Sequence, residues 1–333
     1  MAKMNFIVTG GAGFIGRNLV KNLRNRYPDS HIIVLDKLGI GSDKKSIRPY
    51  DVEFIELDLS DRKWLGVFCA TVSEPIDCVF HLAAESHVDR SITSPNCFVD
   101  SNVTGTFNIL FGLQNKYKKF MHVSTDEVYG SLNIDSDPSK ETDHLKPSSI
   151  YSSTKASSDL IVLASYHTNK FPVIVTRCCN NYGPGQHDEK FIPVVLNSAL
   201  NDRNIPVYGN GKNVREWIYV DDHANAIIDL SEKGEIGEIY NIGSAYRLDN
   251  ISLAKHILKI LNKPESLINF VTDRLGHDIC YKLDSSKTRS TVNLTKYDEQ
   301  IFLQFLKQTV ENHILSVNKK KGEIPWECSI TSK

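Results

Sequence analysis

The sequence predicts an α/β protein whose main sheet is parallel and covered by helices on both faces. The first observation is an apolar run over residues 4–9, which ends in a glycine-rich turn. An amphipathic segment and a second apolar run over residues 31–36 follow it, giving the order of a βαβ unit. The second observation is that this alternation continues to about residue 180. Both are typical of a doubly wound, Rossmann-type sheet.

The other elements follow from the same patterns. Further strands are expected at residues 52–57, 78–82, 120–124 and 173–177, with helices at 100–116 and 151–168. After residue 180 the loops become rich in Gly, Asn and Pro, and amphipathic helices are expected at 250–261 and 298–313. We therefore expect a nucleotide-binding domain over residues 1–180, with parts of 215–245 returning to it. A smaller C-terminal substrate-binding lobe over 181–317 and a loose tail over 318–333 complete the prediction.

Composition excludes several classes of protein. The 333 residues are 41% hydrophobic with a net charge of −1, which gives no electrostatic argument for nucleic acid or an acidic membrane surface. No segment approaches the about 20 apolar residues of a membrane span. The seven cysteines include no C-x-x-C pair, so no metal site is expected. Without a secretory leader at the start, we expect a cytoplasmic protein.

The glycine-rich turn predicts a dinucleotide site. Gly10 permits a tight turn, Gly13 lets the backbone approach a pyrophosphate, and Gly16 lets the helix pack closely. Asp36 follows at the end of the next strand, where a carboxylate suits the ribose hydroxyls of NAD and repels the 2′-phosphate of NADP. The alternative is a glycine turn that only allows close packing and binds no cofactor. Further contacts with NAD are expected from Phe14, Ile15, Lys37, Asp58, Leu59, Leu82, Ala83, Ala84 and Ser124.

A tyrosine and a lysine four residues apart predict a redox site. Tyr151 and Lys155 project from one face of the expected helix. A nearby ammonium lowers the pKa of a phenol, which makes the tyrosine a base for an alcohol proton. Lys155 can also hold the nicotinamide ribose. An unconnected surface pair is the alternative.

Two adjacent carboxylates suggest a second chemical step. Thr125, Asp126 and Glu127 begin where the fifth strand ends, which is where ligands bind in such sheets. Thr125 can hydrogen-bond a substrate hydroxyl. One protonated and one ionised carboxyl would provide an acid and a base, as elimination of water requires. The alternative is a pair of loop carboxylates or a helix cap.

Several motifs carry a family resemblance from Phe6 to about Val317. They include TGGAGFIG (9–16), HLAAESHVDRS (81–91), STDEVYG (124–130), YSSTK (151–155), NVREWIYVDDHA (213–224) and DRLGHD (273–278). The chain resembles the nucleoside-diphosphate-glucose 4,6-dehydratases of the extended short-chain dehydrogenase/reductase family, which lead to rhamnose and other deoxysugars. The Asp-Glu pair distinguishes them from related 4-epimerases and decarboxylases, which remain the first alternative. A non-catalytic NAD-binding regulatory protein is the second.

The resemblance implies a redox-neutral mechanism. Tyr151 takes the proton of the sugar 4-hydroxyl while the C4 hydride moves to NAD. Glu127 then removes the C5 proton, and Asp126 protonates the departing C6 hydroxyl. The hydride returns to C6 and C5 is reprotonated, which yields a 4-keto-6-deoxyglucose nucleotide. NAD is regenerated in each cycle and is expected to stay tightly bound.

The resemblance also implies a set of substrate contacts. The residues are His87, Thr125, Asn180, Lys190, Phe191, Pro206, Tyr208, Arg215, Asn241, Arg274 and His277. His87 is expected near the sugar, and Thr125 at a substrate hydroxyl. The diphosphate or its surroundings are expected to contact Asn180, Lys190 and Arg215. The nucleotide end is expected near Asn241, Arg274 and His277, with Pro206 and Tyr208 lining the base. The family often has leucine at Phe191, proline at Leu275 and basic residues at Ile279 and Cys280. These departures leave dTDP-glucose and UDP-glucose both open as substrates.

Family members usually form homodimers through two helices of each subunit. The corresponding helices here are those expected at 100–116 and 151–168. Their apolar residues include Phe107, Leu110, Leu160, Leu163 and Ala164. The sequence does not divide these residues between the sheet and a partner, so the homodimer is an expectation from the resemblance.

Overall fold

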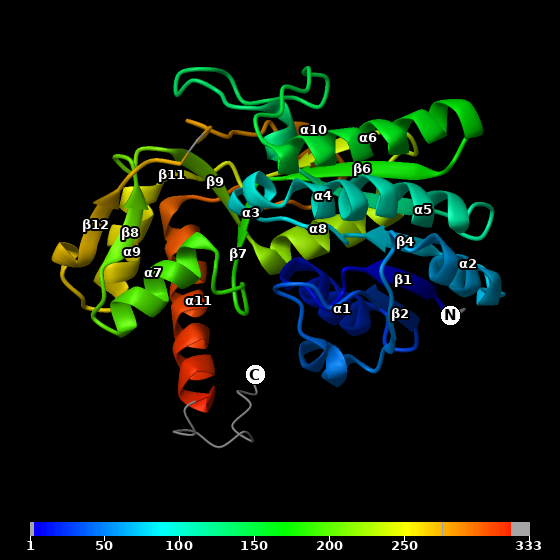
Figure 1. Cartoon of the computed structure of the whole chain (residues 1–333), viewed down its shortest axis with the longest axis horizontal. Helices are drawn as coiled ribbons and strands as arrows, with labels where there is room; N and C mark the ends of the chain where they lie inside the picture. The colour runs from blue at the N-terminus through cyan, green and yellow to red at the C-terminus, as the bar shows by residue number, and fades with distance from the viewer. Residues whose placement is uncertain (1–2, 275, 321–333) are drawn as a thin grey trace.

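The computed structural model describes residues 3–274 and 276–320. Its centre is a parallel seven-stranded sheet with the order β10-β6-β5-β4-β1-β2-β3 (Figure 1). The strands are β1 (Asn5–Thr9), β2 (His31–Asp36), β3 (Glu53–Glu56), β4 (Cys78–His81), β5 (Phe120–Thr125), β6 (Val173–Cys178) and β10 (Ile239–Ile242). The strand order reverses beside β1, which opens a crevice at the carboxyl ends of β1 and β4. The predicted α/β fold with a doubly wound sheet is confirmed.

Alternating apolar side chains of the strands build a core on each face of the sheet. Phe6 and Val8 of β1 join one cluster, whereas Ile7 between them joins the other. The first cluster includes residues of α1 (Phe14–Arg26) and α8 (Val220–Lys233). The second includes residues of α2 (Arg62–Thr71), α5 (Gly105–Gly112) and α6 (Ile150–Asn169). The helices therefore cover both faces, as expected for continuous apolar strands.

The helix expected at 100–116 is irregular and ends earlier. Helical structure begins with α4 (Pro95–Phe98), continues as a π-helical turn (Val99–Thr104) and ends with α5 at Gly112. The buried Asn102 lies in the π turn, accepts a hydrogen bond from the Glu85 amide at 2.8 Å and donates to Thr154 at 2.9 Å. Such a turn often marks a functional region.

The smaller lobe contains two small sheets and three main helices. One sheet joins β7 (Asn180–Tyr182), β9 (Val214–Tyr219) and β11 (Arg247–Asp249), and the other joins β8 (Ile205–Tyr208) and β12 (Ile268–Val271). The helices are α7 (Phe191–Leu200), α9 (Asn250–Ile260) and α11 (Glu299–Lys320). Short elements complete the fold: α3 (Val88–Thr93), α10 (Ser286–Thr291), and 3-10 helices at Lys44–Tyr50, Asp126–Tyr129 and Glu265–Leu267.

Residues 220–242 return from this lobe to the large sheet. Helix α8 packs against α1, and β10 pairs with β6 in parallel. The expected tail differs from the structure, because α11 continues through Lys320. Residues 318–320 are therefore helical, and residues 321–333 lie outside the described part of the chain.

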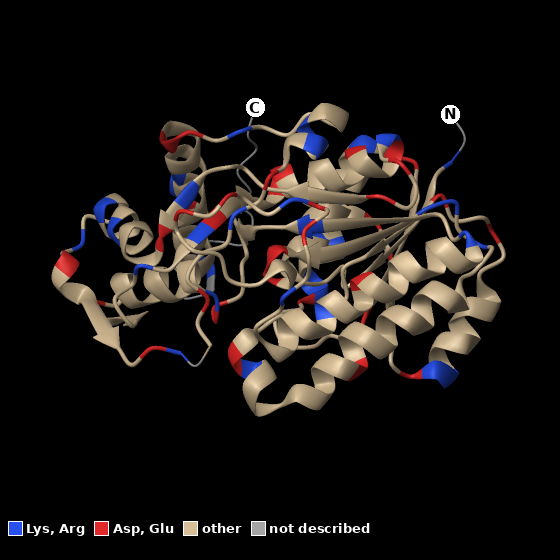
Figure 2. Ribbon diagram, turned by 90° about the horizontal axis from the view of Figure 1, so that it is seen from above, with Lys and Arg blue, Asp and Glu red and all other residues tan. Residues whose placement is uncertain are grey.

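Charges of both signs are interspersed over the two lobes (Figure 2). This distribution agrees with the net charge of −1 and provides no field of a single sign. Within residues 3–274 and 276–320, no helix combines the length and the apolarity needed to cross a membrane. In the same ranges, no group of three or more His, Cys, Asp or Glu side chains is placed to hold a metal ion.

Candidate active site

The turn between β1 and α1 packs closely against neighbouring backbone because its glycines lack side chains. Gly10 has a φ of +68°, and a Cβ atom there would lie 2.7 Å from the Ala83 nitrogen. A Cβ atom at Gly16 would lie 2.1 Å from the Gly10 oxygen. Helix α1 begins at Phe14 with Gly13 as its N-cap and without a capping side chain. Its first turn therefore offers amide donors and the positive end of a helix dipole to phosphate groups.

Asp36 both borders the pocket and shapes the turn. Its carboxylate accepts hydrogen bonds from the Ala12 amide at 3.0 Å and the Leu38 amide at 2.8 Å. Burial raises its pKa, while these bonds oppose the rise. The neighbouring Lys37 contacts Glu85 at 3.1 Å. Sequence reasoning assigned Asp36 only to the ribose, and it missed Glu85, although that residue lies in the quoted HLAAESHVDRS motif.

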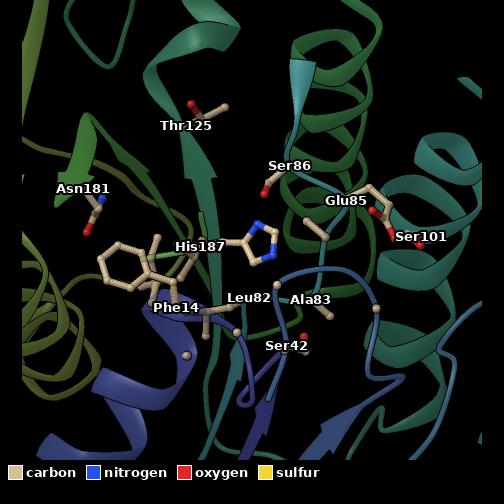
Figure 3. A pocket seen from close by; sticks show the side chains of 18 of the residues that line it. Phe14, Ser42, Leu82, Ala83, Glu85, Ser86, Ser101, Thr125, Asn181 and His187 are labelled. Carbon is tan, nitrogen blue, oxygen red and sulfur yellow. The ribbon is translucent and has the colours of Figure 1, made fainter. Parts of the chain in front are cut away.

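All the residues assigned to NAD line one pocket, which also reaches the chemical residues (Figure 3). They are Gly10, Gly13, Phe14, Ile15, Gly16, Asp36, Lys37, Asp58, Leu59, Leu82, Ala83, Ala84, Ser124, Tyr151 and Lys155. Thr125, Asp126, Glu127, Asn180 and Lys190 line the same pocket. Residues that sequence reasoning missed include Gly41, Ser42, Glu85, Ser101, Gln186 and His187. The glycine loop and the chemical residues thus share one cavity, as a dinucleotide and its substrate require.

The two carboxyl groups of the site have different surroundings. Asp126 is 3% exposed, and its Oδ2 has no partner in the described part of the chain. Burial raises the pKa of Asp126 well above its usual range, and the charges of Glu127 and Glu216 add to this effect. Burial also raises the pKa of Glu127, but Arg215 and two other cations oppose the rise. The geometry therefore favours a protonated Asp126 beside a more readily ionised Glu127.

Helix α6 fixes the positions of Tyr151 and Lys155. A capping box between Ser149 and Ser152 sets its start immediately before the pair. The Lys155 Nζ donates to the Val123 carbonyl at 2.9 Å, and burial lowers the lysine pKa to about 8. Burial, followed by the charge of Glu127, raises the pKa of Tyr151 well above 10. The Lys155 ammonium thus donates to a backbone carbonyl, and its expected lowering of the phenol pKa stays a prediction.

A network of buried polar side chains extends from this helix. Asp159, one turn after Lys155, lies 2.9 Å from the Arg177 Nε and 3.3 Å from the His122 Nε2. The guanidinium of Arg177 also donates a hydrogen bond to the Tyr129 hydroxyl at 2.9 Å. The i, i+4 spacing from Lys155 was the available signal for Asp159. Sequence reasoning did not use it, because a buried partner on another strand is not visible in the sequence.

Basic residues that we expect to contact the substrate act electrostatically on Glu127. Lys190 donates to the Ser86 carbonyl at 2.9 Å, and the charge of Glu127 partly offsets the lowering of its pKa by burial. Arg215 is 7% exposed, donates to the Asp278 carbonyl at 3.0 Å and stacks on Tyr281 at 4.6 Å. Both are therefore held in place by the protein.

Several further polar atoms in this region have no hydrogen-bond partner among the described residues, and two belong to the expected substrate contacts. They are the Nδ1 of His87 and the Nε of Arg274, and both are buried. Burial lowers the pKa of His87, and the charge of Lys190 adds to this effect. Buried donors without a protein partner are expected where a ligand binds.

The residues expected near the base lie at one edge of the small lobe. Pro206 and Tyr208 are exposed on β8, and Tyr208 packs edge-on against His277 at 6.1 Å. His277 in turn contacts Asp273 at 2.7 Å. Phe191 begins α7 and packs against the core.

The departures from the family pattern lie in the same region. Ile279 is 48% exposed and Cys280 is buried. Leu275 lies outside the described residues. The structure therefore places an exposed apolar side chain where the family usually has a basic residue.

The expected nucleotide contact of Asn241 is wrong. Asn241 lies on β10 and is fully buried. Its side chain donates to the Ser139 and Asp284 carbonyls at 3.0 and 3.2 Å and accepts from Tyr129 at 2.8 Å. The amide joins three segments of the fold and has no free donor for a ligand.

The structure shows which apolar residues of the two helices assigned to a homodimer face the core and which are exposed. Leu110 is fully buried and Leu163 packs against the core. Phe107 and Leu160 are 38% and 59% exposed, and Ala164 is also exposed. Apolar side chains are therefore available for a partner, while the homodimer itself stays a prediction.

Comparison with known proteins defines the class. Residues 6–243 match the NAD dependent epimerase/dehydratase family, and the chain belongs to this family. The low-salt glycan biosynthesis protein Agl12 of Haloferax volcanii is 42% identical over 86% of this chain and 92% of its own. A dTDP-glucose 4,6-dehydratase of Escherichia coli is 40% identical over 86% of this chain and 87% of its own.

A solved structure gives the same relationship. DesIV of Streptomyces venezuelae, a dTDP-glucose 4,6-dehydratase with NAD and TYD bound, has a TM-score of 0.87 and 39% identity. The match covers 97% of this chain and 99% of that protein. The fold and the family of the chain are thereby defined.

Proposed function

We propose that this protein is a nucleoside-diphosphate-glucose 4,6-dehydratase that acts on dTDP-glucose or UDP-glucose. The pair of carboxyl groups beside Tyr151 carries the proposal. A 4-epimerase needs a base for one alcohol but no second acid and base. Asp126 and Glu127 share the redox pocket. Burial raises the pKa of both, strongly for Asp126, which supports Asp126 as the acid and Glu127, beside three cations, as the base.

The residues have distinct roles in the proposed reaction. Tyr151 accepts the proton of the sugar 4-hydroxyl, and Thr125 orients that hydroxyl. Glu127 removes the C5 proton, which the neighbouring 4-ketone has made acidic. Asp126 donates its proton to the departing C6 hydroxyl, so that water rather than hydroxide leaves.

A pocket lined by the glycine turn, the start of α1 and Asp36 supports NAD as the cofactor. When bound, NAD would accept the C4 hydride and return it to C6, while a proton returns to C5. Lys155 is placed to hold the nicotinamide ribose. Its cationic form and the positive nicotinamide ring both favour ionisation of Tyr151, which opposes the effect of burial. Retention of NAD throughout the cycle is part of the proposal.

Lys190, Arg215 and Arg274 provide the positive charge for the diphosphate. Each also acts electrostatically on Glu127. Loss of one of these cations is therefore expected to weaken substrate binding. The exposed edge formed by Pro206 and Tyr208 is proposed to contact the base. Both thymine and uracil remain compatible with it.

Mass spectrometry of the sugar nucleotide tests the proposal. The purified protein is incubated separately with dTDP-glucose and UDP-glucose, first without and then with added NAD. Loss of one water is expected from at least one substrate, and the relative rates identify the preferred base. The Asp126→Asn variant serves as the matched control and should bind the substrate without releasing water. A new species of unchanged mass, separated from the substrate by chromatography, would support an epimerase, and no reaction would support the non-catalytic alternative.

A further inference from the structure

Two loops from different lobes meet across the cofactor pocket. One is residues 39–43 after β2, and the other is residues 183–190 after β7, which we call the strap. Figure 3 shows His187 of the strap reaching into the middle of the pocket, between Phe14 on one side and Ser86 on the other. A Cβ atom built on Gly41 would lie 3.4 to 3.6 Å from three atoms of His187. The histidine therefore packs directly against the opposite loop.

The strap is seated on the cofactor helix. Gly183 and Gly185 have φ values of +148° and +81°, which bend the chain over the start of α1. A Cβ atom at Gly185 would lie 1.9 Å from the guanidinium of Arg17 in α1, so the strap lies directly against this side chain. Gln186 donates to the Asn181 carbonyl at 2.9 Å and holds the strap on the other side.

Ion pairs continue this connection along the pocket wall. Glu189 of the strap contacts Arg90 at 3.4 Å, and Arg90 contacts Glu85 at 3.7 Å. Glu85 contacts Lys37, next to the cofactor carboxylate Asp36, at 3.1 Å. The side chains in this series are 12% to 32% exposed, so solvent screens them only in part. The strap is thus attached to the cofactor domain at the histidine and at this series of charges.

We propose that residues 183–190 form a cofactor-retaining strap and that His187 is the residue that closes it over bound NAD. The inference rests on the proposed function, which supplies NAD as the ligand and a redox-neutral reaction. The redox-neutral reaction must return to the sugar the same hydride that it removed. A cofactor that left midway would carry this hydride away. A strap from the substrate lobe prevents that loss, while the adjacent Lys190 extends the same segment to the substrate.

Exchange of bound NAD tests the strap without any sugar nucleotide. The protein loaded with NAD is mixed with an excess of isotopically labelled NAD, and replacement is followed by mass spectrometry. His187→Ala removes the ring and should release NAD about tenfold faster, since such changes act mainly on dissociation. His187→Phe keeps a ring at the contact and should exchange at the wild-type rate. Glu189→Gln, which leaves the shape but removes the charge facing Arg90, should also exchange faster.

A matched control is His167→Ala, which truncates an exposed histidine near the end of α6. This variant should exchange NAD at the wild-type rate. Thermal unfolding with saturating NAD shows whether each variant is folded. Wild-type exchange in both His187→Ala and Glu189→Gln, or exchange in His187→Phe as fast as in His187→Ala, would overturn the proposal. A wild-type protein that retains NAD yet releases no water would instead overturn the proposed function alone.

Discussion

Replacing Lys155 with methionine is expected to stabilise the protein at neutral pH while abolishing its activity. Lys155 is 3% exposed, and burial lowers its pKa from 10.5 to about 8. A depression of this size corresponds to about 3 kcal/mol of unfavourable free energy in the folded state. Methionine also loses the hydrogen bond to the Val123 carbonyl, which costs about 1 kcal/mol. A net gain of about 2 kcal/mol in the free energy of unfolding should remain.

The pH dependence of this gain has a definite sign, because the folded pKa lies below the unfolded value. Below about pH 8 the lysine is protonated in both states, and its full cost is present. Between pH 8 and 10.5 only the unfolded state keeps the proton, so the stability contributed by Lys155 rises with pH. Above pH 10.5 the cost disappears. The advantage of the methionine variant should therefore be largest below pH 8.

Urea unfolding of both proteins at pH 7 and pH 10.5, after removal of bound nucleotide, measures the effect. Removing the nucleotide matters because a ligand that binds only the folded state would add its own stability. Lys307→Met, which replaces an exposed lysine of α11, is the control and should change stability little at either pH. A methionine variant that is no more stable than wild type at pH 7 would refute the reasoning. An equal gain at both pH values would also do so.

Three further outcomes are expected. The Asp126→Asn and Glu127→Gln variants should bind NAD but remove water from the substrate about 10²-fold to 10⁴-fold more slowly, measured by mass spectrometry. Near wild-type rates in both variants would contradict the acid–base roles. Tyr151→Phe should block the first oxidation, so that adding substrate produces no absorbance of reduced cofactor. Asp159→Asn leaves Arg177 buried and unpaired and should cost about 3 to 5 kcal/mol in urea unfolding. The lowered pKa of Asp159 means that wild type keeps this advantage above its ordinary pKa of 3.8 and loses it as the pH falls further.

The sequence predicted the large sheet well because its strands are buried on both faces. Continuous apolar runs such as His31–Asp36 have clear ends, and the structure places β2 at those residues. The helix expected at 100–116 was predicted less well. Its π turn is stabilised by contacts of Asn102 with Glu85 and Thr154, which are distant in the sequence. A local pattern contains no information about such partners.

In the candidate site, too, features set by local sequence were predicted and contacts between distant segments were not. The glycine turn and the Tyr-Lys pair depend on spacing within one segment, so the sequence brings them out directly. The contact of His187 with Gly41 joins segments that are far apart in the chain, and no local pattern indicates it. Asn241 shows the opposite error, since a polar residue at the end of a strand was assigned to the ligand although it joins segments of the protein.

The position of β10 at the edge of the large sheet has a consequence for synthesis of the chain. Strand β6 ends at Cys178, but its neighbour β10 is not available until Ile242 has been made. During translation one edge of β6 therefore has no partner strand until more than sixty further residues have been synthesised. A fragment that stops at residue 180 would keep that edge and would also leave the surface of α1 without α8. The nucleotide-binding half is thus a poor candidate for separate expression or for transplantation as a module.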